Sequence, residues 1–153
     1  MKLAAALMRR ADLQTQINEL QVRLNNNARV QEGEKPAEAP ADLLAALDAA
    51  IAELETLVTQ INLTNAQTVS GEKTITAMIS HRDALLQKSR ILRGFLDEAS
   101  NLAPRYSKTE IRIESAVNVR KLQKDLDAVA KEIRQTEEKL QELNWTVELL
   151  APQ

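Results

Sequence analysis

The chain has no cysteine and a single histidine, which removes disulfides, thiolate metal ligands and cysteine nucleophiles. Aromatic residues make up only 2% of its 153 residues, and there are three glycines. β-Sandwiches, glycine-rich phosphate loops and base-stacking platforms use these residue types heavily. No apolar run is long enough to cross a bilayer. We therefore expect no cofactor, no metal and no contact with a membrane.

Neither sign of charge dominates, because 20 Lys and Arg stand against 22 Asp and Glu, a net charge of −2. No global basic field attracts nucleic acid or anionic lipid. Hydrophobic residues at 44% make the chain too apolar to be disordered. The apolar stretch at the N-terminus stops at Met8 and no cleavage site follows, so we expect no signal peptide and a cytoplasmic location.

Helix-breaking residues divide the chain into four helices. Gly33, Pro36 and Pro40 form one break, Gly71 a second and Pro104 a third. The sequence predicts helices over about residues 3–29, 40–67, 75–101 and 118–150. Pro40 suits the first turn of the second helix, Thr74 or Thr76 the N-cap of the third, and Asn118 the N-cap of the fourth.

Each predicted helix carries an apolar seam that alternates three-residue and four-residue steps. The first seam is Leu3, Ala6, Arg10, Leu13, Ile17, Leu20 and Leu24. The second is Leu44, Leu47, Ile51, Leu54, Val58, Ile61 and Asn65. The third is Ile75, Met78, Arg82, Leu85, Ser89, Leu92, Leu96 and Ala99. The fourth is Val119, Leu122, Leu126, Val129, Ile133, Thr136, Leu140, Leu143, Val147 and Leu150.

This pattern predicts an all-α fold of four long antiparallel helices in a single domain over residues 1–153. Rods of this length pack lengthwise, as a coiled-coil-like up-down-up-down bundle or as an extended pair of hairpins. A second set of apolar residues lies outside the seams: Leu7, Leu43, Leu57, Leu63, Leu86 and Ile91. We expect a homo-oligomer to cover this second set.

The third connection predicts a short β segment at the loop end of the bundle, over residues 107–115. Ile111 and Ile113 alternate there with charged residues, as in a half-buried strand. The first connection lies at the same end and carries Glu32, Glu34, Glu38 and Asp42, opposite the basic Arg105, Lys108, Arg112, Arg120 and Lys121. The strand pairs within the chain or with a neighbouring subunit, and the alternative is two solvated loops.

Polar residues from all four helices gather at the opposite end in up-down-up-down order. This candidate polar cluster comprises Arg10, Asn62, Asn65, Arg82, Asp83, Asn144 and Trp145. One interpretation is a structural layer that fixes helix register, with Arg82 as its hub. The other is an anion or small-ligand pocket in which Arg10 and Arg82 donate and Trp145 forms an apolar wall.

The sequence offers no catalytic set. His81 lacks an orienting partner in the sequence, and the di-iron pattern Glu-x-x-His fails because position 78 is Met. Ser70-Gly71-Glu72-Lys73 is a turn without the spacing of a phosphate loop. We therefore expect no enzyme.

Short motifs in order along the chain carry a family resemblance. They are residues 1–14, Val-Gln-Glu-Gly-Glu at 30–34, Ile-Asn-Leu-Thr-Asn at 61–65, Arg82-Asp83, Arg-Tyr-Ser at 105–107 and Asn-Trp-Thr at 144–146. Together they resemble a small bacterial family often labelled septicolysin, whose function is uncharacterised. The resemblance implies a helical, oligomeric bacterial protein. A thiol-activated lytic activity would need a cysteine, which this chain lacks.

These observations favour a structural or protein-interaction protein that forms a homo-oligomeric helical scaffold. The alternative is an RNA-binding protein that grips phosphates through the basic tip at 105–124, comprising Arg105, Lys108, Arg112, Arg120, Lys121 and Lys124. The net acidity and the lack of stacking aromatics count against nucleic acid. The third possibility is small-ligand or anion binding at the polar cluster.

Overall fold

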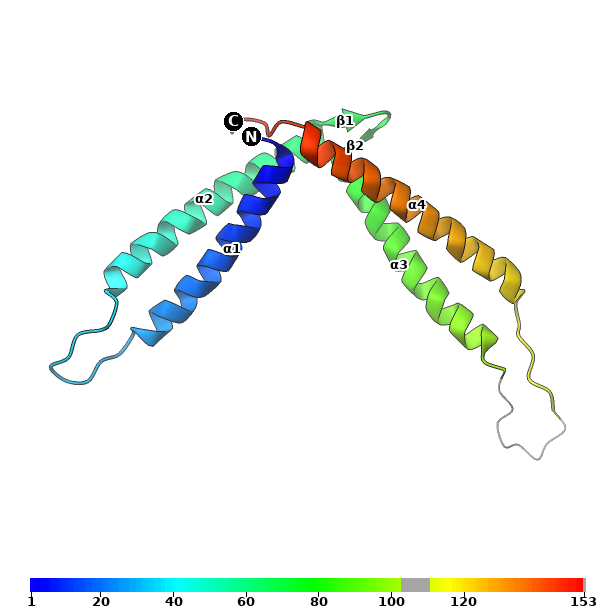
Figure 1. Ribbon diagram of the computed structural model, residues 1–153, viewed down its shortest axis with the longest axis horizontal. Coiled ribbons are helices and arrows are strands. Elements are labelled where there is room, and N and C mark those ends of the chain that lie inside the picture. The colour runs from blue at the N-terminus through cyan, green and yellow to red at the C-terminus, as the bar shows by residue number, and fades with distance from the viewer. Residues whose placement is uncertain (103–110, 153) are drawn as a thin grey trace. The chain divides into compact units, whose positions relative to one another are not determined.

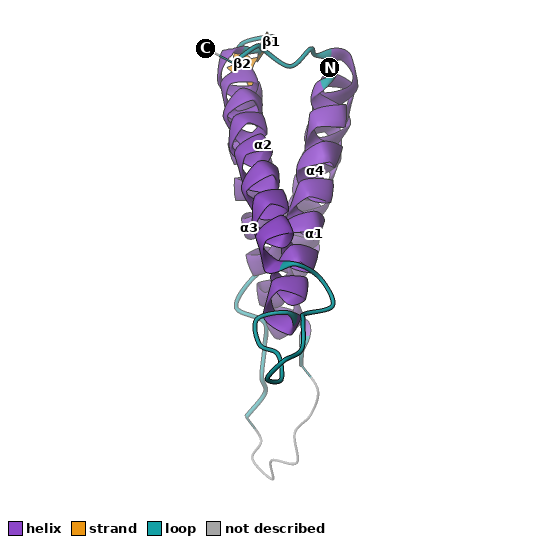
Figure 2. Cartoon of the chain, turned by 90° about the vertical axis from the view of Figure 1, so that its left-hand side faces the viewer, coloured by secondary structure: helices purple, strands orange, loops and turns teal. Residues whose placement is uncertain are grey.

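Four helices make up most of the computed structural model, which describes residues 1–102 and 111–152. They are α1 (Leu3–Asn26), α2 (Pro40–Gln67), α3 (Ile75–Ser100) and α4 (Val119–Thr146) (Figure 1). Two short strands, β1 (Val69–Ser70) and β2 (Lys73–Thr74), lie between α2 and α3. Figure 2 shows how far helix outweighs strand. The prediction of a helical fold is confirmed.

The starts of α2 and α4 follow the predicted capping chemistry. Pro40 occupies the first turn of α2, and the Asn118 side chain accepts a hydrogen bond from the Lys121 N–H at 3.1 Å to cap α4. Helix α1 ends earlier than predicted, because the Asn27 amide donates to the Arg23 carbonyl at 2.8 Å and accepts from the Glu38 N–H at 2.9 Å. Asn27 thereby joins the end of α1 to the loop that leads into α2.

The chain divides into two compact units. Unit 1 comprises residues 1–75 and 142–153, and unit 2 comprises residues 76–141. The prediction of a single domain in an up-down-up-down bundle concerns how these units associate, and it stays a prediction.

In unit 1, α1 and α2 lie side by side and run antiparallel (Figure 1). Two ion pairs hold the hairpin together, Arg9 of α1 with Glu53 of α2, and Arg23 of α1 with Glu38 of the loop before α2. The seam predicted for α1 packs inward, with Leu3, Ala6, Leu13 and Leu20 buried. Arg10 is the exception, since it is exposed.

The seam predicted for α2 is displaced by one residue over its first half. The buried residues are Leu43, Ala50, Leu57, Ile61 and Thr64, whereas the predicted Leu44 and Ile51 are 50% and 47% exposed. Helix α2 has leucines on two adjacent faces, so periodicity alone does not select one. Against α1 the structure places the face with the small Ala50, which allows two helix backbones to approach closely.

Strands β1 and β2 form a two-residue hairpin around Gly71 and Glu72. Val69 pairs with Thr74 and Ser70 with Lys73. Gly71 has a φ of +66° at the first loop position, as a type II′ turn requires, and this conformation strains any residue with a Cβ. The strand hydrogen bonding at this connection was not expected from the sequence, which predicted only a turn there.

In unit 2, α3 and α4 lie side by side and are antiparallel (Figure 1). Both predicted seams are confirmed there. Met78, Leu85 and Ser89 of α3 are buried, as are Leu126, Val129 and Leu140 of α4. Among the residues that the structure describes, no helix is both long enough and apolar enough to cross a membrane.

The prediction of a strand over residues 107–115 is wrong for a single chain in the described part of the segment, residues 111–115. Residues 111–115 form no strand, and Ile111 and Ile113 are 79% and 65% exposed. Positions 107–110 lie outside the described residues. A strand needs a partner for its N–H and C=O groups, and none of the described segments supplies one to residues 111–115. Pairing with a neighbouring subunit stays a prediction.

Candidate functional site

The predicted polar cluster divides between the two units. Unit 1 holds Arg10, Asn62, Asn65, Asn144 and Trp145, and unit 2 holds Arg82 and Asp83. The prediction that they form one layer or one ligand pocket therefore stays a prediction.

Within unit 1 the members of the cluster differ in their surroundings. Arg10 and Asn62 are exposed, and Trp145 is 59% exposed, so its ring is not a buried wall. Asn65 and Asn144 are half-buried. The Oδ1 atom of Asn65 is buried and has no hydrogen-bond partner among the described residues. An unpaired amide oxygen accepts a donor, such as a water molecule, rather than an anion.

Within unit 2, Arg82 donates to the Asp83 carboxylate from Nε at 3.1 Å and from a terminal nitrogen at 3.0 Å. The Arg82 side chain is 32% exposed and that of Asp83 is 60% exposed. The Arg82 guanidinium therefore pairs with Asp83 at the surface of unit 2. A long side chain that starts on a seam keeps its apolar stem in contact with the core and carries its charge to water.

His81 has a partner that the sequence did not indicate. Its Nε2 lies 2.8 Å from Oε1 of Glu132, and this contact joins α3 to α4 in unit 2. One histidine with one carboxylate does not make a metal site, and no group of three or more potential ligands occurs in the part of the chain that the structure describes.

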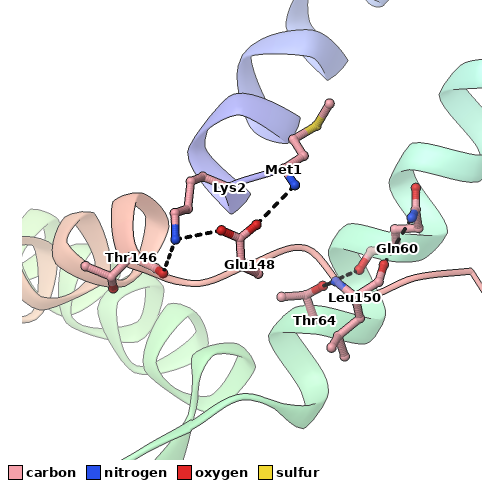
Figure 3. A network of polar contacts seen from close by, with 7 residues as sticks. All are labelled: Met1, Lys2, Gln60, Thr64, Thr146, Glu148 and Leu150. Carbon is pink, nitrogen blue, oxygen red and sulfur yellow. Dashed lines mark hydrogen bonds and ion pairs between the residues drawn. The ribbon is translucent and has the colours of Figure 1, made fainter.

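A network of polar contacts joins the two ends of the chain within unit 1, and we call it the terminal junction: Met1, Lys2, Gln60, Thr64, Thr146, Glu148 and Leu150 (Figure 3). The backbones of residues 1–3 and 147–149 form an antiparallel bridge, with Leu3 N–H donating to Val147 at 2.9 Å and Leu149 N–H donating to Met1 at 2.8 Å. The Glu148 carboxylate accepts from Lys2 at 2.7 Å and from the terminal amine at 3.1 Å. These two cations, the Lys2 ammonium first, hold the pKa of Glu148 below its ordinary value.

Two side chains of α2 complete the junction by holding the backbone of Leu150. The buried Thr64 hydroxyl accepts the Leu150 N–H at 3.0 Å and donates to the Gln60 carbonyl at 2.7 Å. The Gln60 amide donates to the Leu150 carbonyl at 3.0 Å. The predicted helix over 118–150 ends at Thr146 because residues 147–150 make these bonds instead.

The surface feature best suited to binding lies on the α3–α4 hairpin of unit 2. A groove of about 380 Å³ opens between the helices, and we call it the basic groove: Leu86, Ser89, Arg90, Arg93, Ala130 and Ile133. Leu86, Ala130 and Ile133 form an apolar floor, while Arg90 and Arg93 are exposed and charged. Neither arginine makes an ion pair with another described residue. This composition suits an acidic partner with an apolar face.

Two more hollows lie farther along the same hairpin. One of about 240 Å³ includes Phe95, Leu102 and Ile113, and the predicted interface residue Ile113 therefore borders a concave surface. The other, of about 690 Å³, includes Arg120, Gln123 and Lys124. Of these surfaces the sequence indicated only fragments, namely Leu86 outside the main seam and the basic Arg120 and Lys124 of the tip.

Comparison with known proteins places the fold among relatives without a known activity. A family described as "Family of unknown function (DUF6847)" matches residues 10–149. The chain is 38% identical to a functionally unknown conserved protein from Corynebacterium diphtheriae, whose crystal structure aligns with a TM-score of 0.86 over 98% of this chain and 99% of that one. No curated protein matches the chain.

Proposed function

We propose that this chain, which belongs to the family of unknown function DUF6847, is a structural, protein-interaction protein that assembles with copies of itself into a helical scaffold. The observation that carries the proposal is a set of large apolar side chains left exposed at helical spacing. Leu44 and Ile51 are seven residues apart on α2, and Ile91 and Phe95 are four residues apart on α3. Such pairs share a helix face, so they form stripes rather than scattered single residues.

The physical basis of the proposal is that a two-helix hairpin buries one stripe of each helix. The seam of α3 is closed by α4, yet Ile91 is 59% exposed and Phe95 is 47% exposed on another face of α3. Removing apolar surface from water contributes roughly 25 cal/mol per Å². A second copy that covers these stripes is therefore favoured, provided that its own charges are compatible.

The proposal includes coiled-coil packing of the helices in an up-down-up-down bundle, and pairing of the segment around Ile111 and Ile113 between chains. The alternating three-residue and four-residue steps of the buried residues in α1, α3 and α4 support the first part. The exposure of Ile111 and Ile113 supports the second, because alternating apolar residues favour a partner strand. The scaffold needs no cofactor, and the proposal assigns no catalytic activity.

The test is the mass of the particle in solution. Light scattering at micromolar concentration should give a multiple of the 17.1 kDa chain mass. Replacing Ile91 and Phe95 by Glu should lower that mass, while Gln135→Glu at an exposed position of α4 should not. A wild-type particle of 17.1 kDa would contradict the proposal.

Nucleic acid is a second candidate partner, favoured by one observation. Arg120 and Lys124 line the same hollow of about 690 Å³, together with Gln123. Residues four apart on a helix present their charges to one face, where they can contact neighbouring phosphates. A labelled RNA whose mobility shift disappears as salt increases, and with the double change Arg120→Glu and Lys124→Glu, would favour this function over the scaffold.

A further inference from the structure

The two units carry net charges of opposite sign. Unit 1 has 7 Lys and Arg against 12 Asp and Glu, a formal net charge of −5. Unit 2 has 13 against 10, a formal net charge of +3. The near-neutral total therefore conceals two oppositely charged parts. Opposite charges on two surfaces favour their association and disfavour contact of either surface with its own kind.

In unit 1 one face of α2 combines exposed apolar and acidic residues, and we call it the acidic stripe: Leu44, Asp48, Ile51 and Glu55. The steps of four, three and four residues keep all of them on one side of the helix. Neither Asp48 nor Glu55 makes an ion pair with another residue that the structure describes, in contrast to Glu53, which binds Arg9. The stripe is thus an apolar surface with uncompensated negative charge.

The basic groove of unit 2 has the same residue spacing as this stripe and carries the opposite charge. Leu86, Arg90 and Arg93 of α3 repeat the steps of four and three residues found in Leu44, Asp48 and Ile51 of α2. Seven residues span about 10.5 Å along a helix, so the part of the stripe from Leu44 to Ile51 covers the same length as Leu86 to Arg93, and Glu55 lies one turn beyond it. The apolar floor of the groove can receive Leu44 and Ile51, and its arginines can pair with carboxylates along the stripe.

We propose that the partner of the basic groove is a second copy of this chain, whose acidic stripe packs into the groove. This inference rests on the proposed function and specifies the surfaces that form the oligomer. Groove against groove would bring Arg90 and Arg93 of both copies together, and stripe against stripe would do the same for Asp48 and Glu55. Like charges in contact oppose both arrangements, so the contact joins two different surfaces, the acidic stripe of one copy and the basic groove of the other.

The experiment reverses the charge of each surface in the full-length chain. One variant carries Asp48→Lys and Glu55→Lys, and the other carries Arg90→Glu and Arg93→Glu. In each variant alone the stripe and the groove carry the same sign of charge. Sedimentation should therefore show a dissociation constant for self-association that is raised by at least about 100-fold. Mixing the two variants restores opposite charges at both contacts and should restore the wild-type mass. A single chain with all four changes should also associate as the wild type does.

Matched controls make the same charge changes elsewhere. Asp12→Lys with Glu19→Lys alters α1 at the same seven-residue spacing, and Lys88→Glu with Arg134→Glu alters unit 2 outside the groove. Both controls should keep the wild-type mass, and circular dichroism should show that every variant is folded. An oligomer whose mass survives both reversals would overturn this inference and leave the proposed scaffold standing. A wild-type monomer would overturn both the inference and the proposed scaffold. A variant with all four changes that stayed monomeric beside an oligomeric wild type would overturn the inference alone.

Discussion

At the scale of single residues, Thr64 has a structural role that its residue type does not indicate. It is fully buried in the seam of α2, and its hydroxyl accepts the Leu150 N–H while donating to the Gln60 carbonyl. Valine has nearly the same shape but no hydrogen-bonding group. Thr64→Val would therefore leave the Leu150 N–H without its partner while preserving the packing.

We expect Thr64→Val to lower the free energy of unfolding by about 1–3 kcal/mol. The matched control is Thr59→Val on the same helix, since the Thr59 hydroxyl only donates to the Glu55 carbonyl and is exposed. The control should change stability by less than about 0.5 kcal/mol. Urea unfolding followed by circular dichroism measures both, and equal values for the two variants would argue against a role for Thr64 in holding the C-terminal segment.

The carboxylates of Glu38 and Glu53 make the α1–α2 hairpin sensitive to acid. Hydrogen bonds from Arg23 and Arg9 hold the pKa values of Glu38 and Glu53 below the ordinary 4.5. A lowered pKa in the folded state contributes stability above the unfolded value, and this contribution is lost as the pH falls through the folded value. Titration of these two groups should therefore not change the melting temperature at pH 7 and above.

Below about pH 4.5 we expect the melting temperature to fall. A variant with Glu38→Gln and Glu53→Gln should be less stable than the wild type at pH 7 and should approach it as the pH is lowered toward 3. Because all four partners are largely exposed, the difference should be small. Parallel pH profiles for the two proteins would show that these ion pairs do not contribute.

At the scale of helices, the spacing of apolar residues predicts a seam well only when one face of the helix is apolar. Helix α4 has one such face, and each predicted seam residue from Val119 to Leu150 is buried or half-buried. Helix α2 has apolar residues on two faces, and the structure buries Leu43 and Ala50 rather than Leu44 and Ile51. Only the packing against α1 decides between these faces.

The positions of polar groups in the fold could not be predicted from residue type either. Arg82 belongs to the α3 seam by position, but its length allows the guanidinium to reach Asp83 at the surface. The terminal junction could not be predicted from periodicity, because residues 1–3 and 147–150 are far apart in the sequence and pair only in the folded chain. Contacts between residues so far apart in sequence carry no local signal.

The displaced α2 seam leads to a prediction about Ala50. This residue is 4% exposed against α1, so Ala50→Leu would introduce three more carbons into a packed interface. We expect a loss of about 1–3 kcal/mol in the free energy of unfolding. Ala52→Leu places the same side chain on an exposed position of the same helix and should change stability by less than about 0.5 kcal/mol. If Ala52→Leu were the more damaging variant, the register of α2 against α1 would be wrong.

At the scale of the whole molecule, the separation of charge between the units predicts how salt affects assembly. An oligomer held only by apolar stripes such as Ile91 and Phe95 does not weaken as salt is added, because salt does not screen hydrophobic contacts. An oligomer held by Asp48 and Glu55 against Arg90 and Arg93 includes a screened component. The two cases therefore respond differently to the same change of solution.

We expect the dissociation constant to rise as sodium chloride is increased from about 0.1 M to about 1 M, since the Debye length falls from about 10 Å to about 3 Å. Sedimentation velocity over a concentration series measures this change. The variant with all four charge reversals should show the same salt dependence, because its stripe and its groove again carry opposite charges. An apolar contact at Ile91 and Phe95 would instead keep a constant dissociation constant across the series. In that case the stripes on α3, rather than the acidic stripe and the basic groove, would be the surfaces that join the copies.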